Sequence, residues 1–265
     1  MTSPTSPHSV LFVPHGAPTF ALNPGAAGAA MTRTIALQAT PRAIVVLSPH
    51  WDTAVPTVGT AVHPETLHDF HGFPEALYRL TYTATGCPEV AELVVQALQA
   101  AGLEVQTDAQ RGLDHGAWMP LRHLYPEAQI PVIPLSVQSH AGPAHAFRVG
   151  QALNSLTENH VLILCSGNLT HNLGDWHRIS QQGGPTPAYV QVFTDWIALQ
   201  LQEGHLDRLL NYRQLSPEGV RAHPSEDHLL PFFTALGAAG PQAHADAFFR
   251  GISDHVIAMD GYTFH

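Results

Sequence analysis

The sequence contains no lysine, few charged residues of any kind and no long apolar run. All 11 basic residues are arginines, set against 21 acidic residues, so the formal net charge is −10 with histidine counted as neutral. A surface of this sign does not favour nucleic acid or an anionic membrane as a partner. The longest apolar stretches, such as Val161 to Cys165, fall far short of the ~20 residues of a membrane-spanning helix. We therefore expect neither kind of partner.

Cysteine is also scarce. Cys87 and Cys165 lie far apart and form no Cys-x-x-Cys pair, which argues against a disulfide framework and against a thiolate zinc site. Residues Met1 to Pro7 contain neither a basic residue nor a long apolar stretch, so they do not resemble a secretory signal. We expect a cytoplasmic location.

Short apolar strands alternate with helical stretches along the chain. The continuous apolar runs at 43–48 and 161–165 are typical of strands covered on both faces. No internal repeat or low-complexity linker interrupts the alternation, and the loosest stretch, 181–187, is too short to divide domains. The pattern predicts one α/β domain around a largely buried sheet. Further strands are expected at 9–13, 129–137 and within 256–264, and helices at 90–101, 187–201 and 229–236.

Two details of this pattern are specific enough to be checked. Gly102 follows the expected helix 90–101 and is a plausible stop signal. Pro131 and Pro134 lie within the expected strand 129–137, and proline suits an edge or irregular position in a sheet.

Histidine is the residue present in excess, at 19 copies. His15 and His50 each follow an expected strand, and His171 lies just beyond the strand 161–165. In α/β sheets functional groups collect where strands end, and neutral imidazole is the commonest metal ligand. These three positions predict a divalent metal site. Two of them also have a structural interpretation, since His15 could cap a turn and His50 could bond the loop backbone.

Two other segments carry histidine beside acids. His115 lies next to Asp114 between two glycines, which indicates either close approach to a ligand or a glycine-rich turn. Segment 223–231 places acids and a histidine before an expected helix, where Ser225 or Asp227 could serve only as an N-cap.

Taken together, these segments resemble the class III extradiol ring-cleavage dioxygenases, and most closely their 4,5-DOPA extradiol dioxygenase branch. The resemblance runs in order from about Val10 to near Phe264. The motifs that carry it are Pro14-His15-Gly16, Ser48-Pro49-His50-Trp51, His68-Asp69-Phe70-His71-Gly72-Phe73-Pro74, Gly112-Leu113-Asp114-His115-Gly116-Ala117-Trp118, Ser166-Gly167-Asn168 with His171-Asn172-Leu173, and His223-Pro224 through His228-Leu229-Leu230-Pro231.

The resemblance implies a single catalytic domain over residues 1–265, with a central mixed, largely parallel sheet flanked by helices. By motif, it implies that His15, His50 and His228 are metal ligands. It implies that His171 is an acid/base that can approach the metal as a fourth ligand, and that His115 faces the substrate.

The last motif departs from the family pattern. The family usually has Glu immediately before the last ligand, whereas this sequence has Asp227 there and Glu226 one residue earlier. Related enzymes of the protocatechuate type use a carboxylate as the third ligand. Glu226 and Asp227 therefore stay open as alternatives to His228.

The activity that the resemblance implies is insertion of O2 into a catechol held on Fe(II), which opens the ring beside the diol and gives a muconic semialdehyde. The choice among DOPA, caffeate, catechol and an aminophenol stays open. Zinc also suits three or four histidines, but it has no redox chemistry. Candidates to pack the substrate ring are Phe70, Phe73 and Trp118, as an alternative to ordinary core positions.

Two other functions use the same histidines. A zinc hydrolase would activate a metal-bound water with His171 or Asp114 as base, although the sequence has no His-Glu-x-x-His motif. A metal-buffering protein would explain the histidine content, although such a protein should carry histidine tracts and these histidines occur singly. A serine hydrolase is disfavoured because no Gly-x-Ser-x-Gly motif is present.

Overall fold

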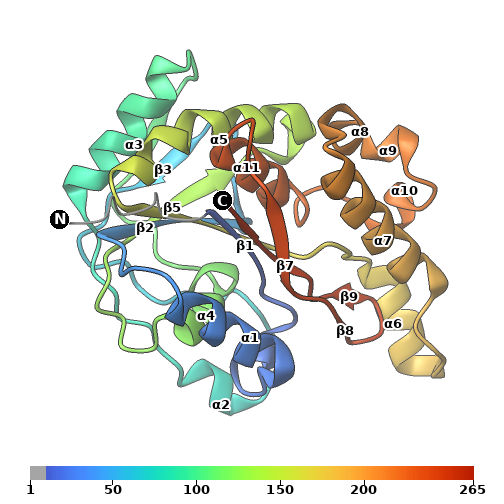
Figure 1. Cartoon of the computed structure of the whole chain (residues 1–265). Coiled ribbons are helices and arrows are strands. Elements are labelled where there is room, and N and C mark those ends of the chain that lie inside the picture. Colours follow the sequence, from blue (N-terminus) through green and yellow to red (C-terminus); the bar gives the residue numbers. More distant parts are fainter. Residues whose placement is uncertain (1–9) are drawn as a thin grey trace.

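An eight-stranded sheet runs through the middle of the computed structural model, which describes residues 10–265 (Figure 1). The strand order is β4-β3-β5-β2-β6-β1-β10-β7. Residues 1–9 lie outside the described residues. They include the first residue of the strand expected at 9–13 and the segment 1–7 that does not resemble a secretory signal. The strands of this sheet are β1 (Val10–Pro14), β2 (Ala43–Asp52), β3 (Thr57–Gly59), β4 (Gln106–Asp108), β5 (Val132–Val137), β6 (Val161–Gly167), β7 (Ala245–Phe249) and β10 (Gly261–Phe264).

The centre of the sheet is parallel and its flanks are mixed. Strands β5, β2, β6 and β1 pair in parallel. Strand β10 pairs antiparallel with β1, β7 with β10, and β3 with β5, whereas β4 is parallel to β3. Two short strands, β8 (Ile252–Ser253) and β9 (Ile257–Ala258), form a separate pair. The expected single α/β domain with a mixed, mostly parallel sheet is confirmed.

Helices cover both faces of the sheet. In Figure 1, α3 (Pro88–Ala100), α5 (Gly142–Glu158) and α11 (Leu230–Ala239) lie on one face, and α1 (Gly25–Ala36) and α4 (His115–Leu124) lie on the other. A further group gathers beside the sheet. This group consists of α6 (Leu173–Gln182), α7 (Ala188–Glu203), α8 (Leu206–Leu210), α9 (Tyr212–Leu215) and α10 (Gly219–Ala222). The remaining short elements are α2 (Glu75–Tyr78) and the 3₁₀ turns η1 (Pro18–Ala21) and η2 (Ser139–Ala141).

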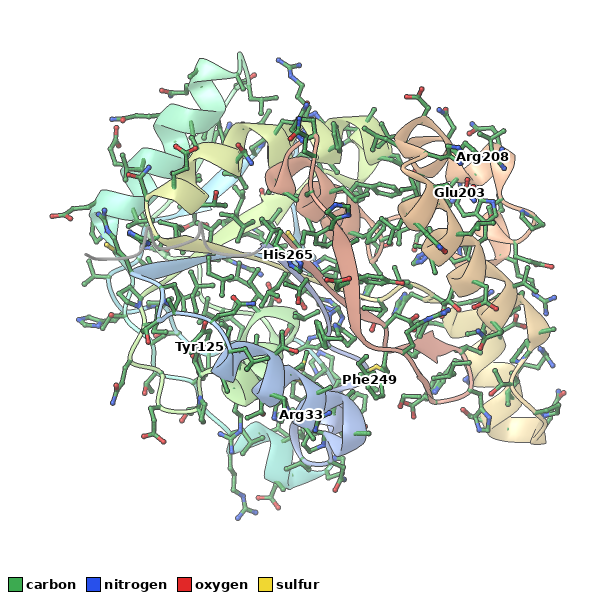
Figure 2. The ribbon with its side chains drawn as sticks, in the orientation of Figure 1. Arg33, Tyr125, Glu203, Arg208, Phe249 and His265 are labelled. Carbon is green, nitrogen blue, oxygen red and sulfur yellow. The ribbon has the colours of Figure 1, made fainter. Side chains whose placement is uncertain are left out.

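Charged side chains lie on the outer faces of several of these helices. Arg33, Glu203 and Arg208, labelled in Figure 2, are exposed on α1, α7 and α8. Within residues 10–265, no helix combines the length and the apolar character needed to cross a membrane.

The three expected helices are confirmed as α3, α7 and α11. Gly102 adopts φ +71° directly after α3, and its N–H bonds the carbonyl of Gln99, so the predicted stop signal is also confirmed. Strand β2 is longer than expected. It passes through Pro49 and His50 to Asp52, with an irregular register between Leu47 and Asp52.

Strand β5 is an interior strand, between β3 and β2, although its prolines suggested an edge or irregular position. Pro134 pairs in register with Val46 of β2. On the other side a Cβ on Gly59 would lie 2.5 Å from Cγ of Pro134, so the absence of a side chain at Gly59 makes room for the proline ring. Strands β3 and β5 pair only through Val58 and Leu135.

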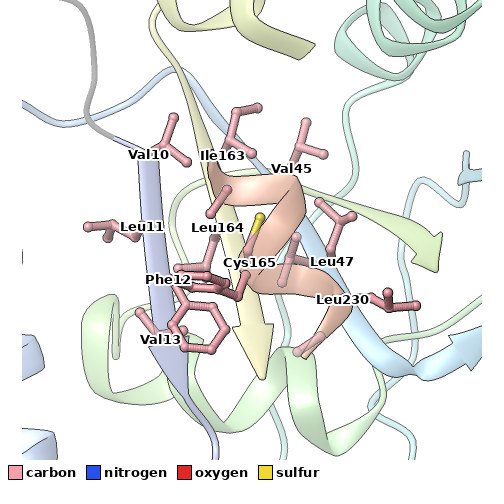
Figure 3. Packing of buried hydrophobic residues seen from close by; sticks show 14 of the residues in the cluster. Val10, Leu11, Phe12, Val13, Val45, Leu47, Ile163, Leu164, Cys165 and Leu230 are labelled. Carbon is pink, nitrogen blue, oxygen red and sulfur yellow. The ribbon is translucent and has the colours of Figure 1, made fainter. Parts of the chain in front are cut away.

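The core lies along the bodies of the central strands, under α11. Figure 3 shows the side chains of Val10 to Val13 of β1 beside those of β2, β6 and Leu230 of α11. All residues of β1 and β6 are buried. The ring of Phe12 meets the ring of Phe232 edge to face, with centroids 5.4 Å apart. Each such side chain contributes roughly 1.5–3 kcal/mol to the free energy of folding when fully buried. The apolar packing therefore fixes the positions of the strand ends.

Candidate metal centre

Five histidines converge at the carboxyl edge of the parallel strands. His15 follows β1, His50 lies near the end of β2, and His171 lies four residues beyond β6. These strands are neighbours in the order β2-β6-β1, which brings their ends together. His115 is the first residue of α4, and His228 lies just before α11. The structure therefore brings together every histidine that the sequence assigned to the site.

Three of the rings are evenly spaced around one point. The ring centroids are 5.2 Å apart for His15 and His50, 5.3 Å for His15 and His228, and 5.0 Å for His50 and His228. The Nε2 atoms of His15 and His50 are 3.4 Å apart. This nearly equilateral arrangement suits three imidazoles that bind the same metal ion.

The other two histidines each lie against one of these three. The His115 ring is 3.8 Å from that of His50 and 5.7 Å from that of His15. The ring of His171 stacks on His228 at 3.5 Å, with 5° between the planes. Two separate groups of residues could each hold a metal ion, because within each group the donor atoms lie within 4.8 Å of one another. They are His15, His50 and His115, and His171, Asp227 and His228.

His15 is held by the end of β6. Its Nδ1 lies 3.0 Å from Oγ of Ser166, and its Nε2 lies 3.4 Å from Nδ2 of Asn168. The backbone N–H of Gly16 donates to Oδ1 of Asn168 at 3.2 Å, and Gly16 adopts φ +60°, which favours glycine. His15 thus directly follows β1 and is held against the end of β6, and the segment is not a hydrogen-bonded turn that the imidazole caps.

Asp69 is a member of the site whose role sequence reasoning missed. Its Oδ1 accepts the backbone N–H of His115 at 2.9 Å, and its Oδ2 lies 3.0 Å from Nδ1 of His115 and 3.8 Å from Nδ1 of His50. Burial raises the pKa of Asp69, but the contacts with His115 and His50 outweigh this and lower it to about 2. The only sequence signal was a carboxylate inside the segment 68–74.

Asp227 and Glu226 have different surroundings. Oδ2 of Asp227 accepts the Nδ1–H of His228 at 2.5 Å. Burial raises the pKa of Asp227, but this bond outweighs it and holds the pKa well below its usual range. Helix α11 begins at Leu230 without a side-chain cap, so the N-cap interpretation of Ser225 or Asp227 is wrong. Oε1 of Glu226 is buried without a hydrogen-bond partner among the described residues.

Asp114 stabilises the start of α4. Its Oδ1 accepts the backbone N–H of Ala117 and the hydroxyl of Ser48, and its Oδ2 pairs with Arg111 at 2.7 Å. These contacts identify it as the N-cap of a helix that starts at His115, in place of the glycine-rich turn that was the alternative.

Burial favours the neutral form of three of these imidazoles, those of His15, His50 and His171. Burial, reinforced by the neighbouring imidazoles, holds the pKa of His15 and of His50 well below 6.5. Burial and the adjacent His228 likewise lower the pKa of His171 to about 2. A neutral imidazole keeps one nitrogen lone pair free. The cluster is therefore a set of electron-pair donors that fits a divalent cation.

Aromatic residues lie on the His115 side of the cluster. The Phe70 ring is 5.6 Å from that of His115, and Phe73 and Tyr78 pack against Phe70 at 5.6 and 5.2 Å. Trp118 is fully buried and donates its Nε1–H to the carbonyl of Leu67. Of the three aromatic candidates, Trp118 is thus a core residue, Phe70 adjoins His115, and Phe73 packs behind Phe70.

Comparison with known proteins adds the family. Residues 10–262 match the model of the catalytic LigB subunit of aromatic ring-opening dioxygenase. The chain is 38% identical over 225 residues to the 4,5-DOPA dioxygenase extradiol of Mirabilis jalapa, covering 84% of this chain and 83% of that one. It is 37% identical over 257 residues to the Beta vulgaris protein of the same name, covering 96% and 95% of the two chains.

Bacterial proteins give the same result. The chain is 34% identical over 255 residues to the 4,5-DOPA dioxygenase extradiol of Escherichia coli K12, covering 94% of this chain and 92% of that one. It also resembles the crystal structure of an uncharacterized protein from Escherichia coli K12, with a TM-score of 0.78 and 28% identity over 97% of this chain and 99% of the other. Among the functions left open by the sequence, these findings select the oxidoreductase. The chain belongs to the LigB family of aromatic ring-opening dioxygenases and is an extradiol dioxygenase.

Proposed function

We propose that this enzyme opens the ring of a DOPA-like catechol with O2, beside the diol, and produces a muconic semialdehyde. The observation that best supports this proposal is the convergence of five histidines at one sheet edge, three of them buried and two, His50 and His171, partly buried. The names of the plant and bacterial relatives support a DOPA-like substrate. We also place the enzyme in the cytoplasm, where a reducing environment fits two cysteines without a disulfide.

The proposed metal ligands are His15, His50 and His228, with His171 close enough to serve as a fourth. The donor atoms of His115 also lie within 4.8 Å of those of His15 and His50. We place His228 in the ligand set because its ring is nearly equidistant from the rings of His15 and His50. The ring centroid of His115 lies only 3.8 Å from that of His50. We propose that His115 contacts the substrate and is not a metal ligand. A ferrous ion in this site would supply the redox chemistry with O2, which zinc cannot supply.

His171 is the proposed acid and base. A ring nitrogen of His171, which lies beside His228 at the sheet edge, can take the proton of a catechol hydroxyl and later return it to a product oxygen. Its ring lies parallel to that of His228, which restricts its orientation. Its backbone N–H is bonded to the carbonyl of Ala222 at 2.9 Å, which fixes the loop beyond β6.

His115 and Phe70 are proposed to hold the substrate ring. His115 is almost completely buried and directed by Asp69, so its imidazole can hydrogen-bond a substrate hydroxyl. The ring of Phe70 meets His115 nearly at a right angle and offers an apolar wall beside it. This division gives the diol a polar contact and the ring an apolar one.

The test is anaerobic reconstitution with ferrous ion, followed by O2 uptake and visible absorbance with DOPA, caffeate, catechol and an aminophenol. We expect a yellow product and one O2 consumed for each substrate opened. Protein loaded with zinc to the same metal content is the matched control and should consume no O2. Absence of uptake with every substrate, despite bound iron, would overturn the proposal.

A further inference from the structure

One carboxylate approaches two histidines of the site from outside the cluster. Asp69 lies between β3 and α2, and its two oxygens have different partners. Oδ1 accepts the backbone N–H of His115 at 2.9 Å, and Oδ2 lies 3.0 Å from Nδ1 of the same residue. Nδ1 of His50 is farther away, at 3.8 Å, so His115 is the main partner.

The Nδ1 atom of His115 has no other acceptor. It is completely shielded from solvent, and no second acceptor among residues 10–265 bonds it. Oδ2 of Asp69 approaches it off the axis of the N–H bond, and a small rotation of the carboxylate would align the two. A proton on this nitrogen therefore has one acceptor, whereas an unprotonated Nδ1 would face a carboxylate with two lone pairs opposed.

The segment that carries Asp69 is held in place on both sides. The Nε1–H of Trp118 donates to the carbonyl of Leu67 at 2.9 Å, and Nε2 of His68 lies 2.9 Å from the carbonyl of Leu80. The hydroxyl of Tyr78 donates to the carbonyl of Phe70 at 3.3 Å. Asp69 is thus presented to His115 by a braced loop.

We propose that Asp69 is a positioning residue that keeps His115 protonated at Nδ1, so that Nε2 faces the site as a hydrogen-bond acceptor. This inference rests on the proposed function for its consequence. An acceptor at Nε2 binds a substrate that offers a hydroxyl at that point, and it selects a catechol hydroxyl over an aromatic ether or a ring without a donor. A protonated Nε2 would donate to a hydroxyl oxygen and to an ether oxygen alike, so it would not make this selection.

The test uses the tautomer of His115, which is measured without turnover. Protein labelled with ¹⁵N at histidine is examined by long-range ¹H–¹⁵N correlation without added metal, and the His115 signals are assigned with His115→Gln. We expect the proton on Nδ1 in the native enzyme. In Asp69→Asn the carboxamide oxygen can still accept the backbone N–H, but the amide that replaces Oδ2 donates, so the proton should move to Nε2.

Asp52→Asn is the matched control. Asp52 also accepts a backbone N–H through Oδ1, that of Ser139 at 2.9 Å, and a hydroxyl of the same residue through Oδ2, and neither oxygen bonds a histidine of the site. It should leave the His115 tautomer and kcat/KM unchanged. Asp69→Asn should lower kcat/KM of the reconstituted enzyme by about 10- to 100-fold, the usual effect of removing a group that orients a site histidine.

The outcomes separate this inference from the proposed function. A native His115 protonated at Nε2, or an Asp69→Asn protein that keeps the proton on Nδ1, would overturn the role of Asp69 whatever the enzyme oxidises. The expected tautomers in a protein that opens no catechol would leave the positioning role standing and overturn the proposed reaction.

Discussion

The bodies of the central strands and their carboxyl ends have opposite chemistry. In their bodies, residues such as Leu11, Val45 and Leu164 are completely buried among apolar neighbours (Figure 3). A few residues further along, at the carboxyl end, the buried side chains include His15 and Ser166. The same sheet therefore buries hydrocarbon at one place and imidazole at the next.

The difference shows which interactions hold each region. Apolar burial is non-directional, so the strand bodies need only volume and shape. Buried polar groups lose hydration and require partners in fixed directions. At the carboxyl edge these partners are hydroxyl, amide and carboxylate groups, such as those of Ser166, Asn168 and Asp69. Substitutions in the bodies should mainly change stability, and substitutions at the edge should mainly change chemistry.

The largest effects are expected for the histidines themselves. His15→Ala, His50→Ala and His228→Ala should each lose metal retention, because each removes a ligand, whereas His171→Ala should lose turnover and retain most of the metal. His115→Ala should also retain it. Metal analysis of the purified variants beside a rate assay checks this, with circular dichroism as the folding control. Full metal content in both His15→Ala and His50→Ala would exclude them as ligands.

In the strand bodies, Leu164→Ala should lower the free energy of unfolding by about 2–5 kcal/mol, because it leaves a cavity in a fully buried position. Denaturant unfolding measures the change. Leu37→Ala is the control, since Leu37 is 89% exposed and its truncation should be nearly neutral. Equal losses in the two variants would contradict the contrast between core and surface.

Acidification should weaken the polar region selectively. Burial lowers the pKa of His223 to about 4, although the bond with the Leu169 carbonyl opposes this. The unfolded chain binds that proton below about pH 6.5, so the stability due to neutral His223 is present above 6.5 and is lost as the pH falls to 4. The difference corresponds to about 3 kcal/mol. Unfolding of the metal-free protein from pH 8 to pH 4 should be less pH-dependent in His223→Gln. An unchanged slope would remove His223 from this effect.

The smallest effect is expected from a single methyl group. A Cβ on Gly116 would lie 2.3 Å from Oγ of Ser48 and 2.8 Å from Cδ2 of His50, so Gly116→Ala should displace His50. We expect kcat/KM to fall by about 10- to 100-fold, as for misplacements of about 1 Å. In Gly174→Ala the new Cβ meets Oδ1 of Asn172 at an ordinary 3.4 Å, and activity should be kept. Equal activity in both variants would show that His50 tolerates displacement.

Elements with a local apolar signal could be predicted from the sequence, whereas positions that depend on distant residues could not. Strands β2 and β6 were predicted because a short, uninterrupted apolar run between turn signals is typical of a strand buried on both faces. The interior place of β5 was not foreseen, because it depends on Gly59, far away in sequence, leaving room for Pro134. The start of α4 had a local signal, the N-cap Asp114, that competed with two glycines nearby.

At the site, residue type was more informative than position. Histidines at strand ends indicated a metal centre, because strand ends share one edge of the sheet. The role of Asp69 could not be foreseen, since its partner His115 is 46 residues away and nothing in the spacing relates them. The arrangement of His115 and His228 around His50 likewise depends on helix packing, which one sequence does not encode in any local pattern.

The position of β1 in the sheet has a consequence for how the chain folds during its synthesis. Its two neighbours are β6 and β10, and Val10 pairs with Phe264 at the other end of the chain. Strand β1 therefore has a partner on both sides only after β10, about 250 residues later in the chain, has been synthesised. Until then its apolar residues lack that neighbour and must be shielded in another way.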